Sequence, residues 1–269
     1  MMEAVQITYR YSGNAAPAVT AVSVCVAPGE TVGIVGPNGS GKSTIGRLLK
    51  GLLLPTEGTV VVDGVDAAEE ELAVRRLVGL VFQNPNSQIV NAVVEQEVAF
   101  GPENLGLSPQ EIRRRVDEAL RAMDLVSLRM AECHELSMAD KQRIAIASVM
   151  AMEPRYLILD EPTAWIEPAA RTRVLGELQQ WASQRQVGLV LITHRMDEAQ
   201  LCGRLYGMLH GRLEIVGPPS AVLHDPLMRA RLALGEPEAY VLVNHLHAAG
   251  LPVTAGESLD QVAESLWRS

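Results

Sequence analysis

The segment Thr31-Val-Gly-Ile-Val35-Gly36-Pro37-Asn38-Gly39-Ser40-Gly41-Lys42-Ser43 decides the fold of this chain. It starts with an aliphatic stretch, Thr31–Val35, which predicts a buried β-strand. The eight residues that follow fit the pattern G-x-x-x-x-G-K-[ST], and an amphipathic helix is predicted from Lys42 onward. Strand, glycine-rich loop and helix, in this order, are what a phosphate-binding loop requires.

The residue types in this loop suit the phosphates of a nucleotide. Glycine lets the backbone fold tightly, so that successive N–H groups point at phosphate oxygens, and the helix N-terminus adds partial positive charge. Lys42 is placed to reach the β- and γ-phosphates, and the Ser43 hydroxyl to ligate Mg²⁺. We therefore predict that residues 36–44, Thr44 included, bind the nucleotide. A glycine-rich turn without function is the alternative, and the flanking strand and helix count against it.

A second feature is the aliphatic strand Tyr156-Leu-Ile-Leu, which ends in two carboxylates, Asp160 and Glu161. In folds with a phosphate-binding loop such a strand runs beside the first one, which puts Asp160 near the Mg²⁺ ion. Glu161 is then placed to orient the attacking water or to accept a proton from it. Two acids after a strand are ordinarily a solvated turn, and the phosphate-binding loop is what makes them candidates for catalysis.

The composition predicts one large α/β domain with a small extension. The 269 residues include 48% hydrophobic but only 4% aromatic side chains, so the core is aliphatic, which favours a parallel sheet. Strands alternate with helices along the chain, as in a doubly wound α/β core. Predicted strands are 5–9, 19–26, 31–35, 59–62, 78–82, 156–159, 188–193 and 205–209, and predicted helices 42–52, 109–123, 139–152, 168–185 and 196–202.

Three departures from strand–helix alternation define the domain organisation. Two strands precede the glycine-rich loop, which predicts an antiparallel β element. Residues 87–153 are predicted to form a helical subdomain inserted into a nucleotide-binding domain of residues 1–216. Residues 217–269 are predicted to be a small C-terminal domain with helices at 220–234, 238–249 and 258–266, and a contact in a dimer.

Charge and cysteine content narrow the function classes. The net charge of −9 and the lack of a long basic run argue against a nucleic-acid partner. Cys25, Cys133 and Cys202 have no metal-ligand or redox spacing, as expected of free thiols in a reducing cytosol. The sequence shows no signal peptide and no apolar run of the ~18–20 residues that cross a bilayer. We expect a soluble chain that reaches a membrane only through a partner.

The remaining motifs resemble those of ABC ATPases, in the family's order and spacing across residues 3–216. Asp160-Glu161-Pro162-Thr163 and then His194, after a strand, follow the family pattern, and Leu136-Ser137 stands where the family carries its signature. Gln83 looks like the Q-loop glutamine, and Tyr11 like the aromatic side chain that stacks on adenine. The stretches 81–90, 98–106 and 144–152 and the helical tail are similar to those of energy-coupling-factor transporter ATPases.

The resemblance implies a P-loop ABC ATPase domain with a parallel core sheet, an antiparallel β subdomain, an inserted helical subdomain and a helical C-terminal appendage. It implies ATP and Mg²⁺, with Asp160, Ser43 and Gln83 near the metal and Glu161, His194 and Gln83 in catalysis. It also implies a second ATPase subunit, a membrane scaffold (T component) and a substrate-binding S component at the cytoplasmic face of the cell membrane, with two ATPs sandwiched between the ATPases. Ser137 of one subunit then lies against the partner's ATP.

The signature departs from the family pattern. Met138-Ala139-Asp140 replaces Gly-Gly-Gln, so a bulky side chain and a negative charge stand where glycine backbone approaches a γ-phosphate. Ser137 with Asp140 also fits a plain helix cap, the alternative that we favour over a working signature. Ala164-Trp165-Ile166-Glu167 replaces Ser-Ala-Leu-Asp, and Trp165 is predicted either to pack across the dimer or to be an ordinary buried residue.

The hypothesis is therefore an asymmetric dimer. The chain's own phosphate-binding site is complete and hydrolyses ATP when a partner supplies an intact signature. The partner's site, which this chain completes with Met138-Ala139-Asp140, hydrolyses ATP poorly. Two alternatives stay open: a soluble ABC protein in nucleic-acid or regulatory work, and an inactive nucleotide-binding regulatory subunit. The sequence names neither the micronutrient, a vitamin or a transition metal ion, nor the partner ATPase, a second gene product or a second copy of this chain.

Overall fold

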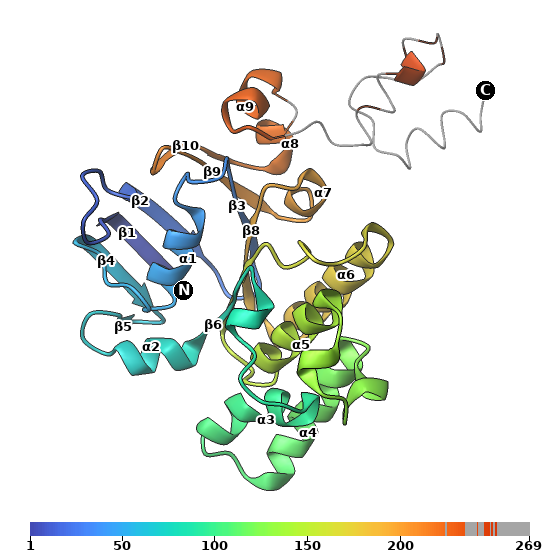
Figure 1. Ribbon diagram of the computed structural model, residues 1–269. Helices are drawn as coiled ribbons and strands as arrows, with labels where there is room; N and C mark the ends of the chain where they lie inside the picture. Colours follow the sequence, from blue (N-terminus) through green and yellow to red (C-terminus); the bar gives the residue numbers. More distant parts are fainter. Residues whose placement is uncertain (224, 235–240, 242–244, 248, 250, 252–269) are drawn as a thin grey trace.

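The computed structural model describes residues 1–223, 225–234, 241, 245–247, 249 and 251. Two β-sheets and the helix α1 (Lys42–Leu49) between them form its centre (Figure 1). The larger sheet has the strand order β10-β9-β3-β8-β7-β6, with β9, β3, β8, β7 and β6 parallel and β10 antiparallel at one edge. Its strands are β3 (Thr31–Val35), β6 (Val78–Val81), β7 (Tyr156–Asp160), β8 (Gly188–Thr193), β9 (Arg204–Leu209) and β10 (Arg212–Gly217).

The smaller sheet is antiparallel in the order β2-β1-β4-β5. Its strands are β1 (Met2–Tyr9), β2 (Val19–Val26), β4 (Glu57–Val62) and β5 (Val65–Asp66). The predicted antiparallel element beside a parallel sheet is thus confirmed. In Figure 1 this sheet stands on the blue side of the molecule, with α1 (Lys42–Leu49) beside it.

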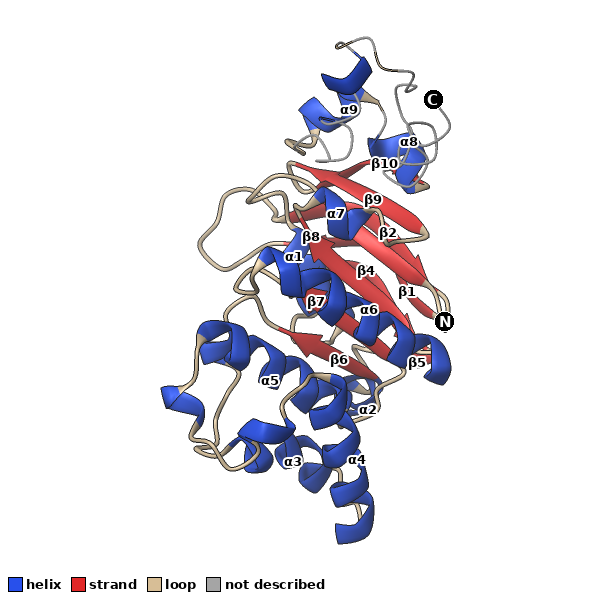
Figure 2. Ribbon diagram, turned by 90° about the vertical axis from the view of Figure 1, so that its right-hand side faces the viewer, coloured by secondary structure: helices blue, strands red, loops and turns tan. Residues whose placement is uncertain are grey.

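The helices fall into three groups. The inserted subdomain holds α3 (Val94–Asn104), α4 (Pro109–Ala122) and α5 (Met138–Met150), with the short turns η1 (Pro85–Ser87), η2 (Val126–Leu128) and η3 (Cys133–Glu135). The core carries α1, α2 (Glu71–Leu77), α6 (Pro168–Arg185) and α7 (Met196–Ala199). The chain then continues into α8 (Pro219–Leu223) and α9 (Pro226–Arg231), which lie at the opposite end of the molecule from α3 and α4 (Figure 2).

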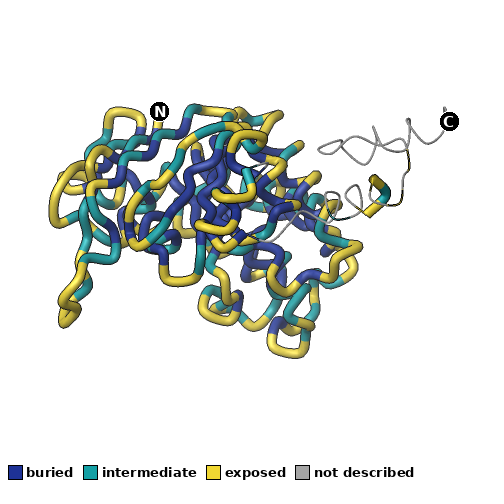
Figure 3. The backbone as a smooth tube through the Cα atoms, turned by 90° about the horizontal axis from the view of Figure 1, so that it is seen from above, coloured by how far each residue is buried: buried dark blue, intermediate teal, exposed yellow. Residues whose placement is uncertain are grey.

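Alternate side chains of the parallel strands enter two different cores. In β8, Leu189 and Leu191 pack with the helices of the inserted subdomain and α6, whereas Val190 and Ile192 pack with α1 and the antiparallel sheet. This is the period-2 alternation of a strand that is covered on both faces. The buried backbone accordingly fills the centre of the molecule and the exposed loops its rim (Figure 3).

The predicted ends of the elements lie within about three residues of the observed ones, which is the ordinary scatter of element ends. The prediction missed β5, α2 and β10, and it covered α3 only within the expected helical subdomain, without bounds of its own. β10 alternates between half-buried and exposed residues and pairs with β9 through the turn His210-Gly211, where both residues have positive φ. A tight hairpin turn of this kind was the available signal.

The predicted single helix over 220–234 is wrong, because the structure divides it into α8 and α9. Asp225 adopts an extended conformation, and its side chain accepts hydrogen bonds from the N–H groups of Leu227 and Met228. Pro226 follows as the first helical residue, so the dipeptide starts a new helix instead of continuing the old one. The predicted helices 258–266 and most of 238–249 lie outside the described residues.

Polar contacts join the two sheets, from Cys25 to Tyr206 and Arg204 and from Asp63 to Tyr156. Asp63, in the turn between β4 and β5, accepts a hydrogen bond of 2.6 Å from the hydroxyl of Tyr156, at the start of β7. Partial burial acts to raise the pKa of Asp63, but the hydrogen bonds from the Met1 amino group and Tyr156 outweigh it and hold this pKa below its usual value. The carboxylate therefore stabilises the fold in its charged form.

We expect Asp63→Asn to cost about 1 kcal/mol of unfolding free energy at pH 7. The folded-state pKa lies below the ordinary value of about 4, so the stabilisation is complete above that pH and disappears as the pH falls through the folded pKa. The wild-type and variant urea unfolding curves should thus converge in acid. Asp124→Asn is the matched control: Asp124 shares the positive φ, but its carboxylate is 71% exposed, so stability should hardly change. A constant difference from pH 7 to pH 3 would contradict the assignment.

Candidate functional site

The glycine-rich loop leaves the end of β3 and enters α1 in a conformation that only glycine adopts easily. Gly36 and Gly41 have φ values of +148° and +102°. A Cβ atom on Gly36 would lie 2.2 Å from the main-chain oxygen of Met208, and one on Gly41 would lie 2.6 Å from that of Ala18. Both positions therefore require glycine for space as well as for backbone angle.

Lys42 turns back over this loop. It is 6% exposed, and its Nζ donates hydrogen bonds of 2.8 and 2.9 Å to the carbonyl oxygens of Gly36 and Pro37. Burial lowers the pKa of Lys42, while the negative charges of Glu161 and Asp160 oppose that shift. The ammonium group is thus held inside the loop, facing the carboxylates of the neighbouring strand.

Asp160 is the last residue of β7 and is 7% exposed. Burial raises the pKa of its carboxyl, the charge of Glu161 adds to the rise, and a hydrogen bond from Ser43 and the charge of Lys42 act against it. The Asp160 carboxyl thus interacts with Ser43 and Lys42, two residues of the glycine-rich loop segment. Burial outweighs the opposing effects of Ser43 and of the nearby positive charges on this carboxyl.

Glu161 stands at the centre of a three-residue cluster. Its Oε2 accepts a hydrogen bond of 2.7 Å from Gln83 Nε2, and its Oε1 lies 3.1 Å from His194 Nδ1. Its main-chain N–H donates to the carbonyl oxygen of Ile192 at 2.8 Å, although its φ of +49° is unusual for a residue with a side chain. Gln83 and His194, the other two side chains predicted for catalysis, therefore both contact the Glu161 carboxylate.

Tyr11 and Thr44 meet at the start of α1. The Tyr11 hydroxyl lies 3.2 Å from Thr44 Oγ1, and Arg47 Nη1 donates to it at 3.3 Å. The ring stands perpendicular to that of Tyr9, with 4.9 Å between the centroids. Tyr11 therefore presents a half-buried aromatic ring next to the helix that carries Lys42, which is where a nucleotide base can be stacked.

The loop fits the phosphates of ATP and the carboxylate edge fits Mg²⁺. Ser40 is 2% exposed, yet its Oγ has no hydrogen-bond partner, and a Cβ on Gly39 would meet open space. Lys42 contacts only loop carbonyls through Nζ, which a phosphate oxygen can replace. Asp160 and Ser43 provide the oxygen ligands that Mg²⁺ prefers.

Ser137 is the one predicted site residue whose bonds run within its own helix. Its Oγ accepts from the N–H of Asp140 at 3.1 Å and donates to Asp140 Oδ2 at 2.6 Å, so it caps α5. Asp140 also forms an ion pair with Arg143, and Met138 Sδ lies 3.4 Å from Asn86 Nδ2. The substituted signature is thus bonded to its own surroundings.

Sequence reasoning missed a contact of Trp165. This side chain is 47% exposed, so the prediction of an ordinary buried tryptophan is wrong, and its Nε1 donates a hydrogen bond of 3.1 Å to the main-chain oxygen of Gln83. Thr163 belongs to the family pattern, but its full burial and its hydrogen bond to the buried Glu198 were not predicted. Only the departure from Ser-Ala-Leu-Asp could have marked Trp165, and no pattern marked Glu198.

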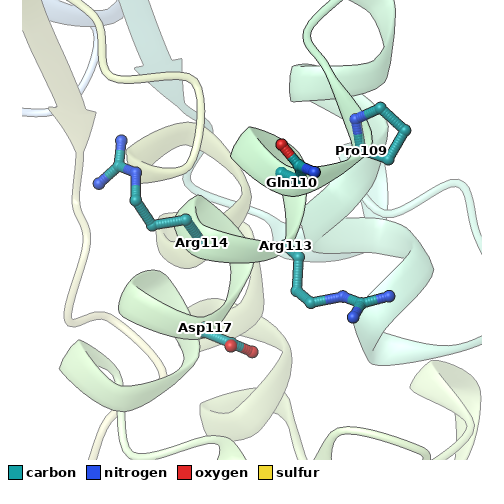
Figure 4. Close-up of a pocket in the computed structure, with 5 residues that line it drawn as sticks. All are labelled: Pro109, Gln110, Arg113, Arg114 and Asp117. Atoms are coloured by element: carbon teal, nitrogen blue, oxygen red, sulfur yellow. The ribbon is translucent and has the colours of Figure 1, made fainter.

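Two other surface features carry less chemistry. A cavity of about 370 Å³ on α4 is lined by Pro109, Gln110, Arg113, Arg114 and Asp117 (Figure 4). Two of its charged residues are already paired, Arg114 with Glu111, Glu118 and Glu153, and Asp117 with Arg129. The exposed trio Glu132, His134 and Glu135 brings three ligand atoms within 4.8 Å of one another, but fully solvated side chains of this kind are common without a metal.

Comparison with known proteins assigns the family. A family model described as ABC transporter matches residues 19–164. The energy-coupling factor transporter ATP-binding protein of Symbiobacterium thermophilum is 44% identical over 270 residues, which cover 97% of this chain and 94% of the relative. The chain belongs to the ABC transporter family. This ABC ATPase is a member of the energy-coupling factor group, since the corresponding protein of Clostridium novyi is also 37% identical over 99% of this chain and 97% of its own length.

Solved structures agree with this assignment. That of cbiO1 from Clostridium perfringens, part of the ABC transporter complex cbiONQ, is 31% identical with a TM-score of 0.77, over 92% of this ABC ATPase and 98% of that chain. The ATP-binding cassette MJ0796, solved as a dimer with ADP and Pi in a post-hydrolysis state, has a TM-score of 0.75 at 27% identity and covers 81% of this chain and 99% of its own. Among the described residues, none of the helices has the length and apolar character needed to span a bilayer.

Replacing Lys42 should separate nucleotide binding from folding. Burial of the ammonium group costs free energy, so we expect Lys42→Met to leave the melting temperature without ligand close to that of the wild type. ATP with Mg²⁺ at ~100 times the dissociation constant should stabilise the wild type by about 2.7 kcal/mol and the variant hardly at all. Lys141→Met, which removes the same group from α5, should keep the full shift. An equal ATP-induced shift in Lys42→Met would contradict the role of Lys42.

Proposed function

We propose that this chain is the ATP-binding and ATP-hydrolysing subunit of an energy-coupling-factor transporter, attached to the cytoplasmic face of the membrane through a scaffold component. The observation that carries the proposal is the Glu161 cluster: a carboxylate fixed between Gln83 and His194, next to the phosphate-binding loop. The curated relatives named above, which align over nearly the whole chain, supply the transporter context. The transported micronutrient, a vitamin or a transition metal ion, is carried by a separate S component.

Each residue of the site has a defined task in this proposal. The loop N–H groups and Lys42 hold the phosphates, and Tyr11 stacks on the adenine. Asp160, Ser43 and Gln83 hold Mg²⁺, which when bound neutralises charge on the β- and γ-phosphate oxygens. Glu161 orients the attacking water and accepts its proton, and His194 contacts the γ-phosphate.

We propose that binding of ATP rearranges this cluster. In the structure each oxygen of Glu161 has one partner, Gln83 on one and His194 on the other. Each carboxylate oxygen has two lone pairs, and departure of Gln83 would free one more acceptor position for the attacking water. We therefore propose that Gln83 leaves Glu161 when it becomes a metal ligand, which ties activation of the carboxylate to occupancy of the site.

The membrane scaffold docks, in this proposal, beside the segment that follows Gln83. A cavity of about 300 Å³ there is lined in part by Ile89, Val90 and Cys133. Val90 is 68% exposed, and its N–H is held by Glu97, a 3%-exposed side chain that also accepts from Asn91. The loop is therefore held by Glu97 while the Val90 side chain faces outward, an arrangement suited to a partner helix.

A second ATPase subunit completes the site. We propose that this chain's own phosphate-binding site is competent and that its signature serves the partner's ATP poorly, because the Ser137 hydroxyl already donates to Asp140 and a carboxylate repels a triphosphate. The partner is a different chain with an intact signature in the favoured version, or a second copy in the other. Residues 217–269 are proposed to contribute a dimer contact; α8 itself packs on β9 and β10.

An inactive regulatory subunit is the second candidate, and the altered signature is what favours it. Phosphate release by the purified chain, measured over a range of protein concentrations with Glu161→Gln as control, separates the possibilities. ATP binding without turnover means that a partner must supply the signature. Turnover that rises faster than linearly with protein and disappears in Glu161→Gln means that two copies suffice, and the asymmetric model falls. A pull-down experiment distinguishes a transporter ATPase from a soluble ABC protein that acts on nucleic acid. Recovery of a membrane scaffold supports the first, and recovery of RNA or DNA supports the second.

Restoring the signature tests the asymmetry directly. We expect the triple substitution Met138→Gly, Ala139→Gly and Asp140→Gln to raise phosphate release in the complex with the partner ATPase, because the second site then joins the first. The gain should persist when Glu161→Gln is added in this chain, since the restored signature completes the site on the partner's loop. An unchanged rate of phosphate release after the triple substitution would count against the asymmetric dimer.

A further inference from the structure

Gln83 is held at two points by a single loop. The loop formed by residues 161–167 joins β7 to α6 and contributes both partners. Glu161 Oε2 accepts from the Gln83 side-chain amide at 2.7 Å, and Trp165 Nε1 donates to the Gln83 main-chain oxygen at 3.1 Å. Side chain and backbone of Gln83 are thus fixed relative to the same short segment.

This loop is itself firmly anchored. Ile166 is 3% exposed, and its N–H donates to the carbonyl oxygen of Thr163 at 3.0 Å. Thr163 is fully buried and bonded to Glu198. Arg171, on α6, donates to the carbonyl oxygen of Ile166 at 2.7 Å. Trp165 therefore projects from a rigid base, and its indole cannot follow Gln83 if Gln83 moves away.

Core packing does not account for the indole. At 47% exposed, Trp165 buries only part of its large apolar surface, whereas Trp181 on α6 is 8% exposed. A tryptophan that ends half in solvent and directs its one donor at a main-chain oxygen acts mainly through that hydrogen bond. The bond joins the loop that carries Glu161 to the segment that begins at Gln83.

We propose that Trp165 is a positioning residue for Gln83: its indole N–H fixes the Gln83 backbone so that the side-chain amide reaches the Glu161 carboxylate. The inference deepens the proposed function, on which it rests, by naming a residue that acts on the site without touching nucleotide. If the Gln83 amide turned from Glu161 toward a bound metal ion, the hydrogen bond from Trp165 would keep the Gln83 backbone in place. Without the hydrogen bond from the indole, the Gln83 backbone shifts. The Gln83 side-chain amide is then no longer fixed, either at the Glu161 carboxylate or at the metal site.

The segment after Gln83 provides a direct readout. Its amides are protected by local hydrogen bonds, from Phe82 N–H to Gln88 Oε1 at 3.0 Å and from Ser87 N–H to the carbonyl oxygen of Asn84 at 3.0 Å. Hydrogen exchange of a peptide covering residues 82–89 therefore reports how firmly this segment is held. The measurement uses the full chain without nucleotide, so it does not depend on turnover.

The first experiment compares Trp165→Phe with the wild type and with Trp181→Phe as matched control. Phe keeps an aromatic ring and removes the donor. We expect exchange of the 82–89 peptide to be roughly 2- to 10-fold faster in Trp165→Phe, the range for loss of one neutral hydrogen bond. In Trp181→Phe, exchange of this peptide should be unchanged. Equal exchange in Trp165→Phe and wild type would overturn the proposal.

The second experiment is a double-mutant cycle on ATP turnover in the reconstituted complex. Trp165→Phe should lower kcat several-fold with little change in KM for ATP, and it should cause no further loss in a Gln83→Ala background, because it acts through Gln83. Additive losses would show that Trp165 acts elsewhere and would overturn the proposal. Absence of ATP turnover in the wild-type complex would contradict the proposed function instead. The hydrogen-exchange comparison of the 82–89 peptide would still decide the role of Trp165.

Discussion

The in-register parallel pairing of β3, β8 and β7 is the constraint on which the whole site depends. Val35 lies opposite Thr193, and Asp160 lies opposite Ile192. Parallel strands end at the same edge of a sheet, so the loops that leave these three strands emerge side by side. The phosphate-binding loop, the carboxylates and His194 come from segments far apart in the sequence and meet for this reason alone. A shift of one strand by a single residue would separate Asp160 from Ser43.

The same pairing concentrates charge in a small, partly buried space. Lys42 and Asp160 are nearly inaccessible to solvent, and Glu161 lies beside them. The opposite pKa shifts of Lys42 and Asp160 have the same cause, burial of the charged form. Without ligand the chain offsets this cost by internal bonds: Lys42 to loop carbonyls, Asp160 to Ser43, and Glu161 to Gln83 and His194.

An ABC-type site is formed by a phosphate-binding loop and a signature segment, and in this chain these two halves differ in how well they retain the family's residues. The phosphate-binding half keeps every expected side chain in contact with its neighbours. The signature half is satisfied internally, since Ser137, Asp140 and Arg143 bond to one another at the start of α5. A helix cap of this sort stabilises its own helix end but leaves few groups free for a partner's phosphate. We propose an asymmetric assembly because the signature residues are bonded to one another, and not only because they differ from the family pattern.

Sequence alone determined the local features. The glycine pattern of residues 36–43 fixed the loop, aliphatic runs fixed the strands of the parallel sheet, and family resemblance ordered Tyr11, Gln83 and His194 along the chain. Such features depend on neighbours in sequence or on residue types that few alternatives can replace. Only the tertiary structure decided that Gln83 and His194 share the Glu161 carboxylate, that Trp165 bonds to the Gln83 backbone, and that Tyr156 links the sheets through Asp63. These contacts join residues 33 to 93 positions apart, and strand pairing and packing, which no local pattern encodes, bring them together.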